Sequence, residues 1–136
     1  DPETQPVMMR LRSDLSELIE AAIDGRLHEV QARWDPRSAL GVVMAAENYP
    51  HTPRIGDVIH GLNEIAPADS KLFHAGTKLE DGQVLSTGGR VLCATALGDS
   101  VRDAQAAAYA LAEQVSWLGE FHRNDMGWRA IGREQA

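Results

Sequence analysis

Two glycine-containing turns, Asp81-Gly82 and Gly88-Gly89, constrain the fold of this 136-residue sequence more than any other feature. The segments around them are rich in strand-forming residues. Asp-Gly and Gly-Gly are the strongest short signals for a β-hairpin, because their residues accept the backbone angles of tight turns. The sequence therefore predicts three consecutive antiparallel strands joined by these turns, over residues 71–79, 83–86 and 90–97.

A long helix is predicted directly after the third strand. Apolar residues recur there at spacings of three and four, from Val101 to Leu118, and Ser100 is a good capping residue for the helix start. Residues 40–46 form a further buried strand in this interpretation, and residues 57–62 form a short strand or a strand edge. The predicted fold is α+β: a small antiparallel sheet of about four to five strands with one long helix packed on it.

The N-terminal part has a different pattern. Leu11, Leu15, Leu18 and Ala22 form the stripe of an amphipathic helix, so residues 5–24 are one kinked helix or two short ones. Ser13 is placed to cap a helix start, and Gly25 fits the position just past a helix end. The polar stretch that follows ends near Asp35-Pro36. We therefore place a domain boundary here, between residues 1–36 and 37–136.

Composition limits the possible functions. The net charge of −7 argues against a general nucleic-acid or membrane-surface binder, which is usually basic. Cys93 is the single cysteine, so the sequence contains no CxxC metal site, and its apolar neighbours favour a core position. No apolar stretch approaches the roughly 20 residues of a membrane helix, and no signal peptide is visible. We expect a cytoplasmic protein of one modest core.

Two cations stand close to the glycine turns. Lys78 precedes Asp81-Gly82, and Arg90 directly follows Gly88-Gly89. A cation beside glycine can bind an anion together with backbone N–H groups, because glycine lets a ligand approach closely. These residues are compatible with a phosphate pocket, but taken alone they favour a solvated hairpin with two surface charges.

Several blocks, taken together, resemble the phosphoribosylamine–glycine ligase family. They run in the family's order and span nearly the whole chain: 1–8, 38–46, 56–62, 73–97 and 127–131. The resemblance implies a small, strongly bent antiparallel sheet with helices, docked against an ATP-grasp core to which the helical residues 1–36 belong. It also implies the ligase reaction, in which ATP activates glycine as glycyl phosphate and 5-phosphoribosylamine attacks it to give glycinamide ribonucleotide for purine biosynthesis.

The same resemblance implies that the chain is a C-terminal fragment. In the family, an Arg-Phe-Gly precedes Asp1, and the residues that hold ATP and Mg²⁺ (or Mn²⁺) lie further upstream. We therefore expect the fragment alone to be inactive, and its partners to be glycine, 5-phosphoribosylamine, ATP and its own ATP-grasp core, with no nucleic acid and no membrane. The alternative is a free-standing, non-catalytic binding module derived from this domain.

The resemblance also assigns roles to individual residues. Lys78 and Arg90 are expected to bind the 5-phosphate of the ribosyl substrate, with the N–H groups of Gly88 and Gly89 approaching the same phosphate. Asp1 is the candidate catalytic residue, expected either to orient the attacking amine or to bind the ribose hydroxyls. Two further residues, His74 and Glu3, are possible substrate contacts. The histidines show no metal-binding spacing, so we expect no metal ligands in this chain.

Overall fold

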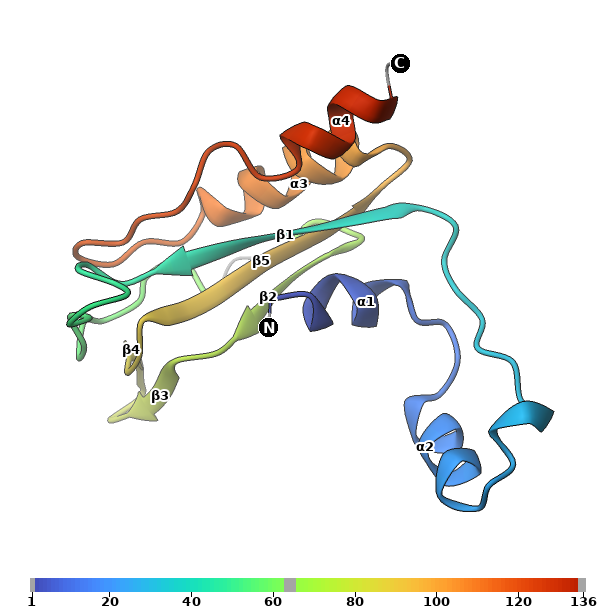
Figure 1. The fold of residues 1–136 in the computed structure, drawn as a ribbon. Helices are drawn as coiled ribbons and strands as arrows, with labels where there is room; N and C mark the ends of the chain where they lie inside the picture. The colour runs from blue at the N-terminus through green and yellow to red at the C-terminus, as the bar shows by residue number, and fades with distance from the viewer. Residues whose placement is uncertain (1, 63–65, 135–136) are drawn as a thin grey trace.

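The computed structural model describes residues 2–62 and 66–134 and has the predicted α+β class (Figure 1). Its elements, in chain order, are α1 (Thr4–Arg10), α2 (Leu15–Ile23), the short 3₁₀ helix η1 (Leu27–Glu29), β1 (Ser38–Ala45), β2 (Ser70–His74), β3 (Thr77–Glu80), β4 (Gln83–Ser86), β5 (Arg90–Gly98), α3 (Val101–Ala112) and α4 (Trp128–Glu134).

The central sheet has three antiparallel strands in the order β1-β5-β2. Alternate residues of β1 and β5 point to the same face, where Val42 pairs with Ala94 and Met44 with Leu92. These side chains are fully buried beneath α3, together with Ala104 and Ala108 of the helix. The small alanines on both surfaces let the helix pack close to the sheet, and they place the core between α3 and the central strands.

Helix α1 covers the opposite face of the central sheet (Figure 1). Its Pro6 reaches Gly41 of β1, where an added Cβ would lie 3.4 Å from the proline Cγ and 3.0 Å from the Sγ of Cys93. Cys93 is buried there, as predicted, and burial raises the pKa of its thiol. The sheet is therefore sandwiched between helices from the two ends of the described chain.

The prediction of a single sheet is wrong. Strands β3 and β4 form a separate two-stranded hairpin, because the predicted strand 71–79 breaks at Ala75-Gly76. Gly76 leaves the strand direction there, and its N–H donates to the carbonyl oxygen of Arg90 at 2.9 Å. Residues 57–62, predicted as a short strand or a strand edge, form no regular strand, and Val58 and His60 make isolated bridges to Leu85 and Ser116.

The starts of α2 and α3 are capped by side chains, but one capping residue differs from the prediction. Residues 5–24 contain two short helices, one of the two expected arrangements, and Asp14 rather than Ser13 caps α2 by accepting from the N–H of Ser16. The prediction of Ser100 as the cap of α3 is confirmed, with Asp103 completing the capping box. Helix α3 ends at Ala112, earlier than the apolar pattern indicated.

Residues 13–33, which contain α2 and η1, form an excursion from the rest of the chain that we call the α2 arm (Figure 1). Two backbone hydrogen bonds close its base. The N–H of Arg12 donates to the carbonyl oxygen of Arg33 at 2.9 Å, and the N–H of Asp35 donates to that of Arg10 at 2.7 Å. The arm therefore leaves and rejoins the main body at one place.

A buried carboxylate lies at this closure. The side chain of Asp35, 2% exposed, accepts hydrogen bonds from Arg12 and from Arg37, whose Nε and Nη2 lie 3.0 and 2.9 Å from its two oxygens. Arg37 also binds Asp69, just before β2. The guanidinium of Arg37 is the main reason that the pKa of Asp35 lies far below its usual range. This network links the base of the arm to the central sheet.

Candidate functional site

The glycine turns predicted to bind phosphate are held together by backbone hydrogen bonds. We call residues 74–77 and 87–90 the turn pair. The N–H of Gly76 donates to the carbonyl oxygen of Arg90 at 2.9 Å, and the N–H of Thr87 donates to that of Gly76 at 2.8 Å. An added Cβ at Gly76 would lie 2.8 Å from the Arg90 oxygen, so only glycine allows this contact. The turn pair joins the end of β2 to the start of β5.

The two glycines between β4 and β5 have different surroundings. An added Cβ at Gly89 would lie 2.2 Å from the ring Cδ2 of Tyr49, so the ring occupies that space. At Gly88 the nearest atom would be the Cα of Gly76, at an ordinary 3.5 Å. Neither glycine N–H donates a hydrogen bond to any residue that the structure describes. Gly88 therefore presents its backbone N–H without a side chain that would obstruct a ligand.

Arg90 and His74 lie at strand ends within the turn pair. Arg90 begins β5 and has an exposed side chain, and His74 ends β2 and is exposed as well. The Nδ1 of His74 lies 3.0 Å from the hydroxyl of Thr77, which fixes one edge of the imidazole ring. The other ring nitrogen, Nε2, is left for a different partner.

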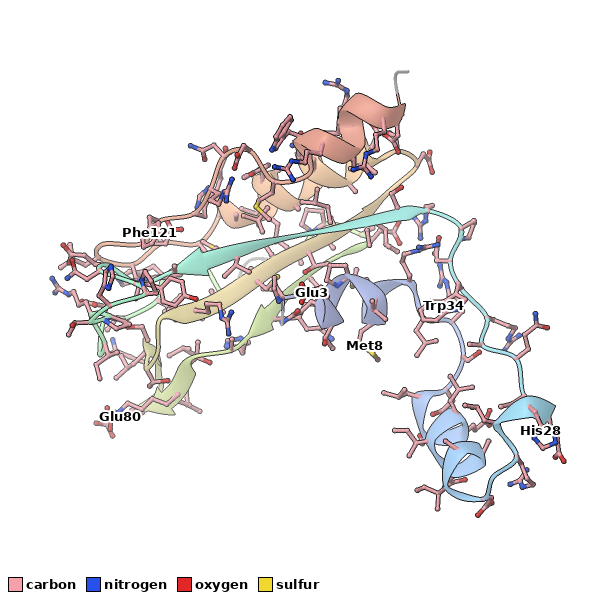
Figure 2. All side chains as sticks on the ribbon, in the orientation of Figure 1. Glu3, Met8, His28, Trp34, Glu80 and Phe121 are labelled. Atoms are coloured by element: carbon pink, nitrogen blue, oxygen red, sulfur yellow. The ribbon has the colours of Figure 1, made fainter. Side chains whose placement is uncertain are left out.

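Lys78 lies beside the turn pair, on β3. Its side chain is 48% exposed, and its Nζ lies 2.9 Å from a carboxylate oxygen of Glu80. In Figure 2, Glu80 lies at the outer tip of the β3–β4 hairpin. Lys78 must therefore leave this ion pair before it can bind a ligand at Gly88 and Gly89.

The two acidic candidates lie at the other end of the chain. Glu3 is the N-cap residue of α1, with an exposed side chain, and Figure 2 shows it beside the central sheet rather than at the β3–β4 hairpin. Asp1, the predicted catalytic residue, lies outside the described residues. The structure brings the backbone of Gly76 close to that of Gly88 and Arg90, and Glu3 stands at the start of α1, which packs on β1 and β5.

Sequence reasoning missed two residues of this site. Tyr49 supplies the ring that packs on Gly89, and Thr77 holds the imidazole of His74. The Asn-Tyr-Pro stretch at Tyr49 indicated only a loop, with no signal that its ring reaches the turn. Thr77 offered a weak signal, since it lies three residues after His74 across a glycine turn.

Among residues 2–62 and 66–134, no three His, Cys, Asp or Glu side chains are grouped closely enough to hold a metal ion. In the same part of the chain, no helix combines the length and the apolar character needed to cross a membrane.

The comparisons with known proteins agree with one another. The sequence profile described as "Phosphoribosylglycinamide synthetase, C domain" matches residues 39–129. The chain is 62% identical over 136 residues to a phosphoribosylamine–glycine ligase of Xanthomonas campestris, covering 99% of this chain and 31% of the relative. It is 59% identical over 136 residues to the enzyme of that name from Salmonella typhimurium, covering 99% of this chain and 32% of the relative.

A solved structure gives the same result. The crystal structure of the phosphoribosylamine–glycine ligase of Thermotoga maritima matches with a TM-score of 0.63 and 32% sequence identity. The match covers 79% of this chain and 27% of that one. The chain thus spans about a third of the length of the relatives that it matches.

Proposed function

The chain belongs to the family of the phosphoribosylglycinamide synthetase C domain, and from this membership we propose that it forms the C-terminal part of a phosphoribosylamine–glycine ligase. That enzyme would join glycine to 5-phosphoribosylamine with the consumption of ATP. Relatives that carry this name are about 60% identical over nearly the whole chain, which supports the proposal. The helical residues before 37 would belong to the ATP-grasp core, and the rest to the C-terminal domain.

Within this ligase, the turn pair would bind the 5-phosphate of phosphoribosylamine. The observation that carries this assignment is the pair of N–H groups at Gly88 and Gly89, which bind no described residue and stand directly before Arg90. Successive backbone N–H groups form concave sites for anions, and a guanidinium adds charge-assisted hydrogen bonds in a planar fork. This combination fits a phosphate better than a carboxylate-bearing glycine, which has fewer acceptor oxygens.

Other residues would complete the substrate site. Lys78 would exchange Glu80 for the phosphate, and His74 would contact the ribosyl group through its outward nitrogen. Asp1 would orient the attacking amine, with Glu3 as a further possible contact. A substrate held at its phosphate end has its amine restricted to a small volume, and this restriction lowers the entropic part of the barrier.

ATP and the divalent metal would be bound mainly by the other part of the ligase. The described residues of this chain offer no group of three potential metal ligands, so they fit a substrate-binding role better than a metal-binding one. When bound, ATP and its metal supply the activated phosphoryl group for glycine. The residues of the turn pair would only bind and orient the acceptor substrate.

The decisive experiment replaces Arg90 by alanine in a full-length ligase whose C-terminal third is this chain. Loss of a charged hydrogen bond to phosphate costs about 1.5–3 kcal/mol, so the KM for phosphoribosylamine should rise about 10- to 150-fold. The KM values for ATP and glycine should change little. Arg102→Ala is the matched control, since Arg102 is an exposed arginine on α3, which covers the other face of the sheet from α1.

An equal rise in the KM for ATP, or an unchanged KM for phosphoribosylamine, would contradict the phosphate assignment. If the unmodified full-length protein formed no glycinamide ribonucleotide from ATP, glycine and phosphoribosylamine, the result would favour the non-catalytic binding module instead.

A further inference from the structure

A groove at the C-terminal helix combines aromatic and basic side chains. It has a volume of about 350 Å³ and is lined by α4 and the segment just before it. Its walls include one indole ring, one thioether and three guanidinium groups, those of Trp128, Met126, Arg123, Arg129 and Arg133. Tryptophan, methionine and arginine are enriched at the centres of protein–protein interfaces, and tryptophan and arginine often dominate the binding energy there. The groove therefore has the composition of a contact site.

Two of the three arginines carry charges that no described carboxylate neutralises. Arg123 donates hydrogen bonds of 2.8 and 2.7 Å to the two carboxylate oxygens of Asp125. Arg129 and Arg133 are exposed, and neither forms an ion pair with any residue that the structure describes. They lie four residues apart on α4, and like charges at this spacing destabilise a helix. The arrangement is unfavourable within the chain and becomes favourable when anionic groups bind both arginines.

Trp128 gives the groove an apolar contact surface. Its side chain is 58% exposed, and the guanidinium of Arg129 lies 5.2 Å from the centroid of its ring. Stacking on an aromatic face holds a guanidinium in place and leaves its N–H groups for a carboxylate. An exposed indole also favours binding, because a partner removes its apolar surface from water. The groove thus offers an apolar surface with a cation fixed beside it.

The groove lies away from the N-terminal helices. Helix α4 packs on α3, and α1 covers the opposite face of the central sheet (Figure 1). Under the proposed function, residues 1–36 belong to the ATP-grasp core, so the side that carries α1 would face that core. The side that carries α4 would then be available to a separate protein.

We infer that the groove of Trp128, Arg129 and Arg133 is a docking site for an acidic, amphipathic segment of a separate protein. Four residues of a helix rise about 6 Å, so two glutamates one helical turn apart in the partner can each bind one arginine. An apolar side chain between them lies on Trp128. A nucleic acid fits less well, because a long polyanion would extend beyond the groove over a chain of net charge −7.

The test measures the binding of a fluorescein-labelled peptide to a full-length ligase whose C-terminal third is this chain, by fluorescence anisotropy at low salt. The probe peptide repeats the unit Glu-Ala-Ala-Leu, which places its glutamates one helical turn apart, and the control peptide repeats Gln-Ala-Ala-Leu. The glutamate peptide should bind at least tenfold more tightly, because hydrogen bonds between charged groups are stronger than neutral ones. Its affinity should fall as the salt concentration rises.

Variants locate the binding in the groove. Arg129→Gln/Arg133→Gln should weaken binding of the glutamate peptide at least tenfold, and Trp128→Ala should weaken it as well. The matched control is Arg102→Gln, an exposed arginine of α3 that does not line the groove, and it should leave the affinity unchanged. Ligase activity should be the same in all these variants. Failure of docking is therefore distinguishable from failure of the phosphate assignment, which the KM effect of Arg90→Ala tests.

Equal binding of the two peptides, or an affinity that the double arginine variant leaves unchanged, would overturn the inference. So would a concentration-dependent dimer in sedimentation experiments that this variant dissociates, since a second copy would then occupy the groove. A short oligonucleotide that binds more tightly than the glutamate peptide and needs the same arginines would overturn it too. If the double variant yields no folded ligase, Arg133→Gln alone replaces it: weaker peptide binding supports docking, and unchanged binding contradicts it.

Discussion

Two adjacent glycines in one turn are required for different physical reasons. Gly89 is a packing requirement, because the ring of Tyr49 lies where a side chain would begin. Gly88 has ordinary space around it and no positive φ, so the fold itself does not demand a glycine there. A ligand that approaches the N–H groups of the turn would explain why position 88 is a glycine. Substitutions at the two glycines therefore test the stability of the turn and its proposed phosphate binding separately.

Substitution by alanine should change a different property at each position: stability at Gly89 and substrate binding at Gly88. Gly89→Ala forces the Tyr49 ring aside and should lower the free energy of unfolding by about 1–3 kcal/mol, measured by urea denaturation of the chain. Gly88→Ala should change stability by less than about 0.5 kcal/mol but raise the KM of the full-length ligase for phosphoribosylamine. If Gly88→Ala lowered the stability of the chain, or left the KM for phosphoribosylamine unchanged, the proposal that Gly88 binds the phosphate would be contradicted.

Sequence reasoning at this scale found residue types but not their neighbours. It selected Lys78 and Arg90 by their distance from glycine turns, but it did not foresee that Lys78 pairs with Glu80, two residues along the same strand. The sequence shows that Glu80 lies two residues after Lys78. The two side chains can form an ion pair because β3 is a strand, in which residues i and i+2 point to the same face. The Tyr49–Gly89 contact joins residues 40 positions apart and leaves no local pattern.

Elements with strong local signals were predicted well. The strand at 90–97 is the centre of the sheet, and Ser100 begins the helix after it, because a capping box and a strictly periodic apolar pattern depend on near neighbours alone. The break between β2 and β3 was not predicted. Residues 71–79 read as one strand, and the hydrogen bonds that divide them come from Thr87 and Arg90, which belong to other elements.

The capping box of α3 offers a direct test at the level of an element. Ser100→Ala removes the hydroxyl that accepts from the N–H of Asp103, and should lower the free energy of unfolding by about 1 kcal/mol in urea denaturation. Asp99→Ala, one residue earlier and outside the box, is the control and should have a smaller effect. Equal losses from both substitutions would show that charge near the helix start, rather than the cap, stabilises α3.

At the scale of the whole molecule, one carboxylate joins segments that are distant in sequence. Asp35 binds Arg12 at the start of the α2 arm and Arg37 at the start of β1, and Arg37 continues to Asp69 before β2. The sequence indicated only a connecting segment here. Asp35-Pro36 is a local turn signal, and it does not predict which arginines bind the Asp35 carboxylate. Asp35 and Arg37, on the two sides of the predicted domain boundary, thus hydrogen-bond to each other.

Acid should weaken this connection. Arg37 holds the pKa of Asp35 far below its unfolded value of about 4, and it also lowers the pKa of Asp69. A carboxyl with a depressed pKa in the folded state stabilises the protein above its unfolded pKa, and this stabilisation is lost as the pH falls below about 4. The stability of the chain in urea should therefore decrease from pH 5 to about pH 2.

Asp35→Asn should lower stability at pH 7 and make it less sensitive to pH over the same acid range. Asp125→Asn, which removes one partner of the exposed pair with Arg123, is the control and should have a much smaller effect at pH 7. An Asp35→Asn variant as stable and as acid-sensitive as the unmodified chain would show that the network contributes nothing.

The strand order also has a consequence for synthesis. Strand β5 lies between β1 and β2 and pairs with both, yet it comes last of these three strands in the chain. Until Gly98 has emerged from the ribosome, β1 and β2 lack this pairing partner. Their apolar side chains and their backbone N–H and C=O groups therefore remain exposed. Chaperones that bind nascent chains would therefore bind the unpaired strands between the emergence of Ala45 and that of Gly98. A translational pause within this interval would prolong the exposure of these strands.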